Sequence, residues 1–314
     1  MLFVTFIQYI FYSVLHIAYH PNYVLPVREG HRFPMLKYEL IPDQLLYEGI
    51  VVPENFFKPE MASPAILGLA HDQRYLEAVL NLRLSEKMIR RIGFPLNREL
   101  VDRECLLVQG TVDSSQFAFK HGVSFNIAGG THHAGRDFGE GFCLFNDQAI
   151  AAAFLIEKKI AKRVLIVDLD VHQGNGTAHI FHGHRDVFTF SMHAEKNFPF
   201  IKEKSSRDVP LPDGIEDDEY LMLLQRHLGE VFDVFRPDFL FFQAGVDVLA
   251  TDKLGKLKLS SDACRFRDEL VFFKCREFSV PVQVSMGGGY SAHIKDIVNS
   301  HVATFKAAID IFDL

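Results

Sequence analysis

The chain has 314 residues, of which 48% are hydrophobic, so it can bury the core of one large α/β domain or of two smaller domains. Its net charge of −7 and the lack of a Lys/Arg block give no sign of a nucleic-acid-binding surface, and we expect no nucleic-acid partner. Four cysteines without a CxxC pair argue against a disulfide scaffold and favour a reducing cytoplasm.

The N-terminal segment is apolar, and no Asp, Glu, Lys or Arg occurs in residues 1–27. A basic start and a small-residue cleavage site, which a signal peptide needs, are not evident. Polar residues interrupt the stretch that would have to span a membrane, namely Thr5, Gln8, Ser13 and His16. We therefore expect an apolar extension over residues 1–15 and a domain over 16–314 whose first strand lies near 16–19. The role of the extension stays open, and a membrane role is the less favoured alternative.

Short apolar runs then alternate with amphipathic stretches, and Pro and Gly are spread evenly, which favours a single domain. Helices are predicted within 30–48 (after a loop) and over 71–92, 146–162, 217–235, 261–278 and 291–312. Strands are predicted over 123–128, 164–168, 187–192, 238–243 and 281–286. This alternation indicates an α/β fold with a mostly parallel multi-stranded sheet and helices on both faces.

Residues 164–177 carry the strongest functional signal. Val164 to Val167 has the pattern of a buried strand, and Asp168, Asp170 and His172 follow at steps of two. In extended chain this spacing places side chains on one face. Carboxylates and an imidazole without a thiolate suit Zn²⁺ or another divalent first-row ion. The alternative is an Asp-rich loop that caps a helix, with His172 merely exposed.

Other polar clusters also follow predicted strands, namely 129–133 (Gly-Gly-Thr-His-His), His193, 245–247 (Gly-Val-Asp) and 287–290 (Gly-Gly-Gly-Tyr). In open α/β sheets, sites form outside the carboxyl ends of the strands, so we expect these clusters to meet at one edge. Asp247 is then a third metal ligand or, alternatively, a helix N-cap. The adjacent His132 and His133 are acid/base candidates. Tyr290 brings a phenol to the same edge or is an ordinary packed aromatic residue.

These motifs resemble a known family. Gly-Gly-Thr-His-His-Ala, Gly-Phe-Cys, Asp-Leu-Asp-Val-His-Gln-Gly-Asn-Gly, Ala-Gly-Val-Asp and Gly-Gly-Gly-Tyr occur in the order seen in zinc-dependent histone deacetylases, over roughly residues 16–312. The stretches 31–35, 172–176 and 252–257 look most like class IV and its bacterial relatives. The resemblance implies an arginase/deacetylase-like fold and hydrolysis of the amide of N-acyl-lysine, acetyl or longer, in proteins or peptides. Small acylated amines such as acetylpolyamines are an alternative substrate class.

The resemblance implies two metal sites. Asp170, His172 and Asp247 would bind Zn²⁺, with Fe²⁺ as an alternative, and would leave a position for water and the substrate carbonyl. Asp168, Ser191 and neighbouring carbonyls would form a structural K⁺ site.

Catalytic roles are implied in the same way. His132 and His133 would be the general base and acid pair, oriented by Asp168 and Asn175 respectively. Tyr290 would donate its hydroxyl to the developing oxyanion. Class I members carry Asp where this chain has Asn175. A neutral partner stabilises an imidazolium less than a carboxylate does, so we expect His133 to be neutral at pH 7 and to act as the base.

The substrate-binding residues implied by the resemblance are Gly141, Phe142, Phe198 and Gly288. The two phenylalanines would line a tunnel around the aliphatic stem of the lysine, and the Gly141 carbonyl would accept the substrate amide N–H. We find no equivalent of the Asp that grips the substrate backbone at the tunnel rim of several members. A small acylated amine is therefore conceivable as substrate.

Two other readings compete. An arginase-like ureohydrolase would need a second metal, but 172–174 and 246–249 lack the extra Asp ligands. A non-catalytic acyl-lysine binder would be favoured if Tyr290 or a histidine were missing, yet all are present. Oligomeric state, acyl chain length and natural substrate stay open.

Overall fold

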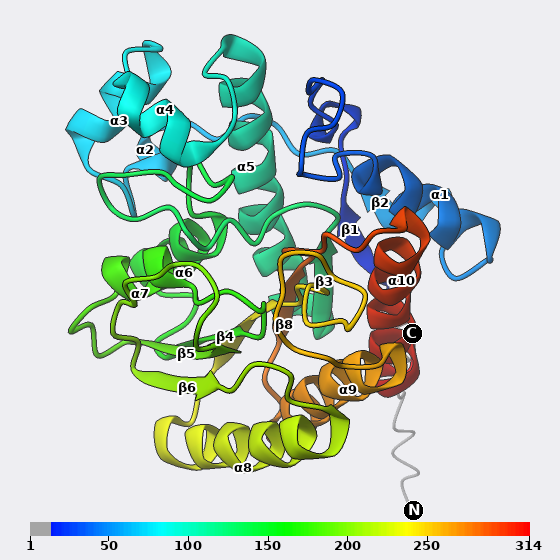
Figure 1. Ribbon diagram of the computed structural model, residues 1–314. Helices are drawn as coiled ribbons and strands as arrows, with labels where there is room; N and C mark the ends of the chain where they lie inside the picture. Colours follow the sequence, from blue (N-terminus) through cyan, green and yellow to red (C-terminus); the bar gives the residue numbers. More distant parts are fainter. Residues whose placement is uncertain (1–13) are drawn as a thin grey trace, which may run out of the picture.

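Eight parallel strands form the central sheet of the chain in a computed structural model, which describes residues 14–314 (Figure 1). The order of the strands is β2-β1-β3-β8-β7-β4-β5-β6. Their bounds are His16–Ala18 (β1), Phe56–Phe57 (β2), Val123–Asn126 (β3), Val164–Asp168 (β4), Val187–Ala194 (β5), Arg207–Leu211 (β6), Phe239–Gln243 (β7) and Val282–Ser285 (β8). The expected extension over 1–15 falls outside the described residues except for its last two.

Helices cover both faces of the sheet (Figure 1). One face carries α5 (Arg98–His121), α6 (Asp147–Glu157) and α7 (Asn175–Ile180), and the other carries α1 (Lys37–Tyr47), α8 (Asp217–Phe235), α9 (Ser261–Phe278) and α10 (Ile294–Phe312). Three shorter helices precede α5: α2 (Pro64–Leu67), α3 (Gln73–Leu80) and α4 (Glu86–Ile92). Two short 3-10 helices lie at Pro21–Tyr23 and Pro53–Asn55. The predicted fold class, a parallel sheet between two helical layers, is therefore confirmed.

The structure differs from the predicted elements in the first half of the chain. The single helix expected over 71–92 is two helices, α3 and α4, because Leu82 takes a positive φ of 57° and Ser85 caps a new helix through Met88 N–H. The edge strands β2 and β6 were not predicted. Both have partly exposed residues and lack the buried apolar run of the central strands.

The longest helix, α5, also had no prediction, because its interior holds residues with weak helix propensity. These residues serve tertiary contacts instead. A Cβ on Gly110 would lie 2.4 Å from the hydroxyl of Tyr23, and Ser114 donates to the Phe125 carbonyl of β3 at 2.9 Å. Close approach of α5 to the sheet therefore outweighs propensity at these positions.

The central strands are buried along their whole length, which explains their continuous apolar sequences. Because β4 pairs with β7 in register, with Asp168 opposite Gln243, the loops that follow these strands start side by side. The loops after β3 and β8 leave the same edge of the sheet. Residues that are far apart in sequence thus meet at the carboxyl ends of the strands.

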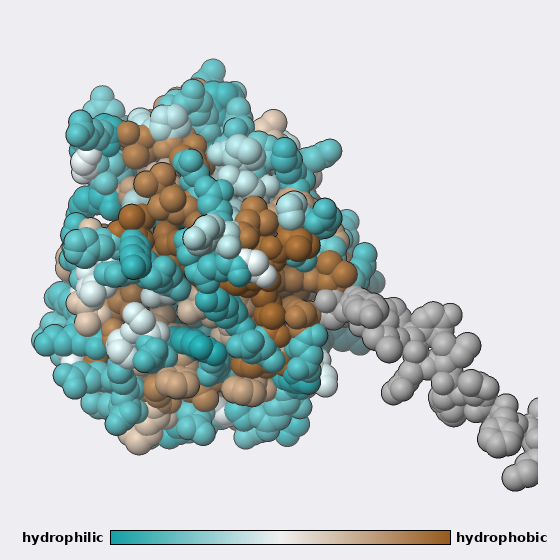
Figure 2. Space-filling view, turned by 90° about the vertical axis from the view of Figure 1, so that its right-hand side faces the viewer, coloured by the Kyte–Doolittle hydropathy of each residue, from teal (hydrophilic) through white to brown (hydrophobic). Residues whose placement is uncertain are grey.

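The surface is mixed in character. On the side that carries α1 and α10, apolar residues gather in patches between hydrophilic ones (Figure 2). Exposed large apolar side chains of α1 and its flanks include Leu36, Leu46 and Val52. Within residues 14–314, no helix combines the length and the apolar character needed to span a membrane.

Candidate active site

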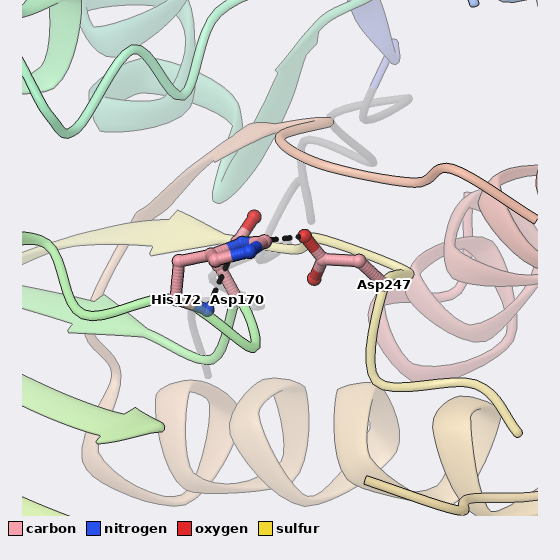
Figure 3. A group of neighbouring side chains, drawn as sticks. All are labelled: Asp170, His172 and Asp247. Atoms are coloured by element: carbon pink, nitrogen blue, oxygen red, sulfur yellow. Dashed lines mark hydrogen bonds and ion pairs between the residues drawn. The ribbon is translucent and has the colours of Figure 1, made fainter. Parts of the chain in front are cut away.

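Asp170, His172 and Asp247 form a buried group in which one potential ligand atom of each lies within 4.8 Å of the others (Figure 3). Asp170 and His172 come from the loop after β4, and Asp247 faces them from the loop after β7. The Nδ1 atom of His172 lies 3.0 Å from Asp170 Oδ1 and 3.1 Å from Asp247 Oδ2. Within residues 14–314 this is the only such group of three or more His, Cys, Asp or Glu side chains.

Backbone N–H groups orient the two carboxylates of this group in a way that suits a bound cation. The second oxygens of both carboxylates accept N–H groups, from Gly288 to Asp170 and from Val171 to Asp247, each at 2.9 Å. A Cβ on Gly288 would lie 2.1 Å from Asp247 Oδ2, so the chain can pass here only without a side chain. Each carboxylate is thereby left with one oxygen beside His172 Nδ1, which is the donor set that a divalent first-row ion accepts.

The charges of Asp170, His172 and Asp247 also favour a bound cation. Burial lowers the pKa of His172, but the two carboxylates outweigh it and raise the pKa to about 10. Burial and the neighbouring Asp170 raise the pKa of Asp247 to about 7. Two buried carboxylates therefore require positive charge between them, which a proton on His172 or a metal ion supplies.

The two adjacent histidines have different partners. His132 Nδ1 lies 2.7 Å from Asp168 Oδ2, and although burial lowers its pKa, Asp168 and Asp170 raise it to about 9. His133 Nδ1 lies 2.6 Å from Asn175 Oδ1, and its pKa is well below the usual value because of burial and the nearby His132. The pair thus combines an imidazole that holds a proton with one that stays neutral at neutral pH.

Glu140 and Arg91 extend the His133 side of the site and were missed by the sequence analysis. Asn175 donates from Nδ2 to Glu140 Oε1 at 2.5 Å, and the other oxygen of Glu140 pairs with Arg91 Nε. The only sequence signal was the place of Glu140 immediately before the Gly-Phe-Cys motif. Nothing in the sequence links it to Asn175, because the two residues meet only through the fold.

An open cavity of about 540 Å³ leads from the surface to His133 and His172. Phe142, Phe198 and Tyr290 line it, and the Phe198 ring stands edge-on to His133 with ring centroids 5.0 Å apart. Gly141 also lines the cavity. It has a φ of +58°, and a Cβ there would lie 2.6 Å from His133 Cδ2. The fold therefore brings the predicted tunnel residues to the metal-ligand group.

Tyr290 stands at the junction of this cavity and the metal-ligand group. Its ring lies edge-on to His172 with centroids 6.3 Å apart, and its backbone N–H donates to Asp252 at 2.6 Å. Burial and the carboxylate of Asp247 raise the pKa of the phenol well above its usual value. The hydroxyl therefore keeps its proton and can act as a hydrogen-bond donor.

The rim of the cavity is basic, with the side chains of Arg32, Arg90, Arg91, Lys196 and Lys256. None of the residues in 14–314 that line the cavity is Asp or Glu. Arg90, Arg91 and Lys256 form ion pairs with carboxylates outside this lining, those of Glu86, Glu140 and Asp213. No salt bridge within the described range involves the other two basic side chains.

Buried polar residues that the sequence analysis did not select hold the loops of the site. Asp147 accepts from the N–H and hydroxyl of Thr131, which fixes the loop that carries the histidines. Arg267 of α9 donates to the carbonyls of Leu169 and Gly245, so one guanidinium joins both metal-ligand loops. Lys37 donates to the Gly287 carbonyl at 2.6 Å.

The residues expected to bind K⁺, Asp168 and Ser191, lie in neighbouring strands. Asp168 is the last residue of β4, and Ser191 and His193 belong to β5. Asp168 and Ser191 are direct neighbours in register, and both are buried. Ser191 Oγ lies 2.9 Å from His193 Nδ1. His193, which the sequence placed at the same edge, is therefore held by β5 and is not a member of the metal-ligand group.

Comparisons with known proteins agree with this geometry. The model of the histone deacetylase domain matches residues 31–305. An uncharacterized protein of Picosynechococcus sp. is 44% identical over 296 residues, which cover 94% of this chain and 99% of the relative. Histone deacetylase 2 of Arabidopsis thaliana is 30% identical over 293 residues, which cover 88% of this chain and 75% of the relative.

Solved structures show the same architecture. A histone deacetylase homologue in complex with SAHA superimposes with a TM-score of 0.80 at 25% identity, over 95% of this chain and 88% of that chain. The HDA15 HD domain superimposes with a TM-score of 0.78 at 22% identity, over 95% of this chain and 90% of that chain, and supports the fold alone.

Fold and sequence matches together define an amide hydrolase of the deacetylase type. The chain belongs to the histone deacetylase family, which confirms the resemblance found in the sequence. The closer affinity to class IV and its bacterial members stays a prediction.

Proposed function

We propose that this protein hydrolyses the amide of N-acyl-lysine, acetyl or longer, in proteins or peptides, with Zn²⁺ held by Asp170, His172 and Asp247. The observation that carries the proposal is that His133, His172 and Tyr290 line one cavity. Asp170 and Asp247 lie beside His172, and the ring of His132 lies 4.1 Å from that of His133. Three protein ligands are typical of a catalytic zinc site. Fe²⁺ suits the same donors and is the alternative ion.

The bound ion would polarise the substrate carbonyl and acidify a water molecule. His133, kept neutral by its low pKa, takes the proton of the attacking water. Tyr290 keeps its proton and donates a hydrogen bond to the developing oxyanion. His132, which shares a hydrogen bond with Asp168, supplies positive charge beside the reacting atoms, and the pair returns a proton to the departing lysine amine.

Residues around this centre would hold the substrate and the loops. Phe142 and Phe198 would enclose the aliphatic stem of the lysine, and the carbonyl of Gly141 would accept its amide N–H. Gly288 would keep the chain close to the carboxylates without a side chain. We further propose that Asp168 and Ser191 contribute to a structural K⁺ site and that the protein acts in the cytoplasm.

The basic rim favours a peptide over a polyamine as substrate. An acetylpolyamine keeps positive charges after acylation, and Arg32 and Lys196 at the rim would repel them. A lysine side chain within a protein loses its charge when it is acylated, so this repulsion does not oppose its entry. A ureohydrolase needs ligands for a second metal ion, and residues 14–314 contain only one candidate metal-ligand group.

One purified preparation can test the proposal. We expect one Zn²⁺ or Fe²⁺ per chain by elemental analysis and turnover of acetyl-lysine or longer acyl-lysine peptides, with faster turnover of peptides that carry acidic rather than basic flanking residues. Asp170→Ala should remove both metal and activity. Two metals per chain would favour the ureohydrolase. Faster turnover of acetylspermidine than of every peptide would assign the small-amine alternative.

A binder without activity is a separate outcome. It would retain metal and bind acyl-lysine peptides without hydrolysing any of them. Calorimetric measurement of peptide binding, beside the turnover assay, distinguishes this case from an inactive preparation. Such a preparation would bind neither the metal nor the peptide.

A further inference from the structure

A buried chain of hydrogen bonds runs from the base candidate to the rim of the cavity. His133 Nδ1 lies 2.6 Å from Asn175 Oδ1, and Asn175 Nδ2 donates to Glu140 Oε1 at 2.5 Å. The second oxygen of Glu140 pairs with Arg91 Nε, and Glu140 is only 4% exposed. The carboxylate of Glu140 thus contacts Asn175, the neutral residue that pairs with His133.

The chemistry of the three groups fixes the direction of every bond in this chain. An ionised carboxylate only accepts hydrogen bonds, so the side of the Asn175 amide that faces Glu140 must be the NH₂ group. The oxygen of the amide then faces His133, and because this oxygen also only accepts, Nδ1 of His133 must carry the hydrogen. The lone pair of the imidazole is left on Nε2.

Without Glu140 the amide has two nearly equivalent orientations. If the NH₂ group faced His133, Nδ1 would have to accept a hydrogen bond and Nε2 would carry the hydrogen. A neutral imidazole in that tautomer has no lone pair on Nε2 with which to take a proton from water. The orientation of one amide therefore decides whether His133 can act as a base.

Arg91 keeps this carboxylate in place. Its guanidinium offsets the charge of the buried Glu140, and its backbone carbonyl accepts the N–H of Gly141 at 3.1 Å. The end of α4 is thereby joined to the loop that carries both Glu140 and Gly141. The ion pair and the backbone bond together restrict where the Glu140 carboxylate can lie.

We propose that Glu140 is a positioning residue, which acts through Asn175 to hold His133 in the tautomer that carries its hydrogen on Nδ1. The proposal rests on the proposed function in so far as His133 is the base. It explains how an Asn can serve where class I relatives have an Asp, because the negative charge lies one residue further from the imidazole.

The decisive experiment combines Glu140→Gln with Asn175→Asp. An amide at position 140 can offer either its oxygen or its NH₂ group, so the orientation of Asn175 is no longer fixed, and we expect kcat to fall about tenfold with KM and metal content nearly unchanged. Asn175→Asp alone places two carboxylates at the contact now 2.5 Å long, and activity should fall as well. In the double variant, the new amide can donate to the new carboxylate, and activity should exceed that of either single variant.

A second readout does not depend on turnover. Long-range ¹H–¹⁵N spectra of the zinc-loaded protein report which ring nitrogen of His133 carries hydrogen. We expect Nδ1–H in the native protein and a mixture of tautomers in Glu140→Gln. If the protein hydrolyses no acyl-lysine substrate, this spectrum still tests the inference, so failure of the proposed function is recognised separately.

Glu86→Gln is the matched control. Glu86 forms an exposed ion pair with Arg90 on α4, the helix that also carries Arg91, and it forms no hydrogen bond with Asn175. It should leave kcat and the spectrum unchanged. A Glu140→Gln protein with native kcat and pure Nδ1–H tautomer would overturn the proposal. So would a double variant no more active than Asn175→Asp alone, and this comparison remains available if Glu140→Gln by itself does not fold.

Discussion

At Tyr290, burial and the nearby Asp247 carboxylate raise the pKa of the phenol, so in the proposed reaction it acts as a hydrogen-bond donor. Tyr290→Phe removes this donor and little else, and we expect kcat to fall by about 10²–10³. Metal content and KM should change little. Steady-state kinetics with parallel metal analysis checks this, and an activity loss below about threefold would remove Tyr290 from the mechanism.

The histidine pair gives a prediction for pH dependence. Because burial and the nearby His132 hold the pKa of His133 below its usual value, His133 is neutral at pH 7 and becomes protonated only as the pH falls well below 6.5. The acidic limb of the kcat/KM profile should therefore lie below pH 6.5. His133→Ala should lose nearly all turnover while keeping the metal, whereas His132→Ala should retain more activity. An acidic limb above pH 7, at constant metal content, would contradict this assignment.

Among the elements, α9 has a structural role that the predicted helix over 261–278 did not indicate. Arg267 is fully buried and bonds Asp268 at 2.7 Å, and it also donates to the carbonyls of both metal-ligand loops. Arg267→Leu leaves the carboxylate of Asp268 buried and unpaired, so the free energy of unfolding should fall by about 3–5 kcal/mol.

Arg265→Leu provides the control on the same helix. Arg265 is about half exposed and pairs with Glu269 and Asp310 at the surface. Its loss should cost about 1 kcal/mol or less. Urea denaturation of both variants measures the difference, and equal destabilisation would show that the buried pair is not the reason for the effect.

For the whole molecule, metal binding should couple to stability because the ligands come from loops after two different strands, β4 and β7. An ion present at 100 times its dissociation constant stabilises the folded state by about 2.7 kcal/mol. Removal of the metal by a chelator should therefore lower the melting temperature, and added Zn²⁺ should restore it.

Asp170→Ala is the matched comparison for the chelation experiment. Its melting temperature should respond neither to the chelator nor to added Zn²⁺, because one charged ligand is gone. A native protein whose melting temperature is equally insensitive to both would show that no ion is bound at Asp170, His172 and Asp247.

The sequence by itself determined the alternation of strands and helices and the positions of the metal-ligand candidates. Both are local properties, because a buried strand has a continuous apolar run and the ligands follow such runs directly, as Asp170 follows β4. The order of the motifs along the chain also identified the family. The break within 71–92 was missed although its cause, the positive φ of Leu82 and the Ser85 cap, is local. The helix α5 was missed because tertiary contacts such as the close approach of Gly110 to Tyr23 override local propensity.

Only the tertiary structure decided which residues lie behind the reacting groups. Glu140 reaches Asn175 across 35 positions of sequence, and Arg267 reaches Leu169 across 98. Such contacts leave no periodic pattern in the chain, since they depend on loops that leave neighbouring strands at one edge of the sheet. The candidate residues of the site could therefore be selected from their motifs, whereas the orientation of each of these side chains depends on the packing of the whole domain.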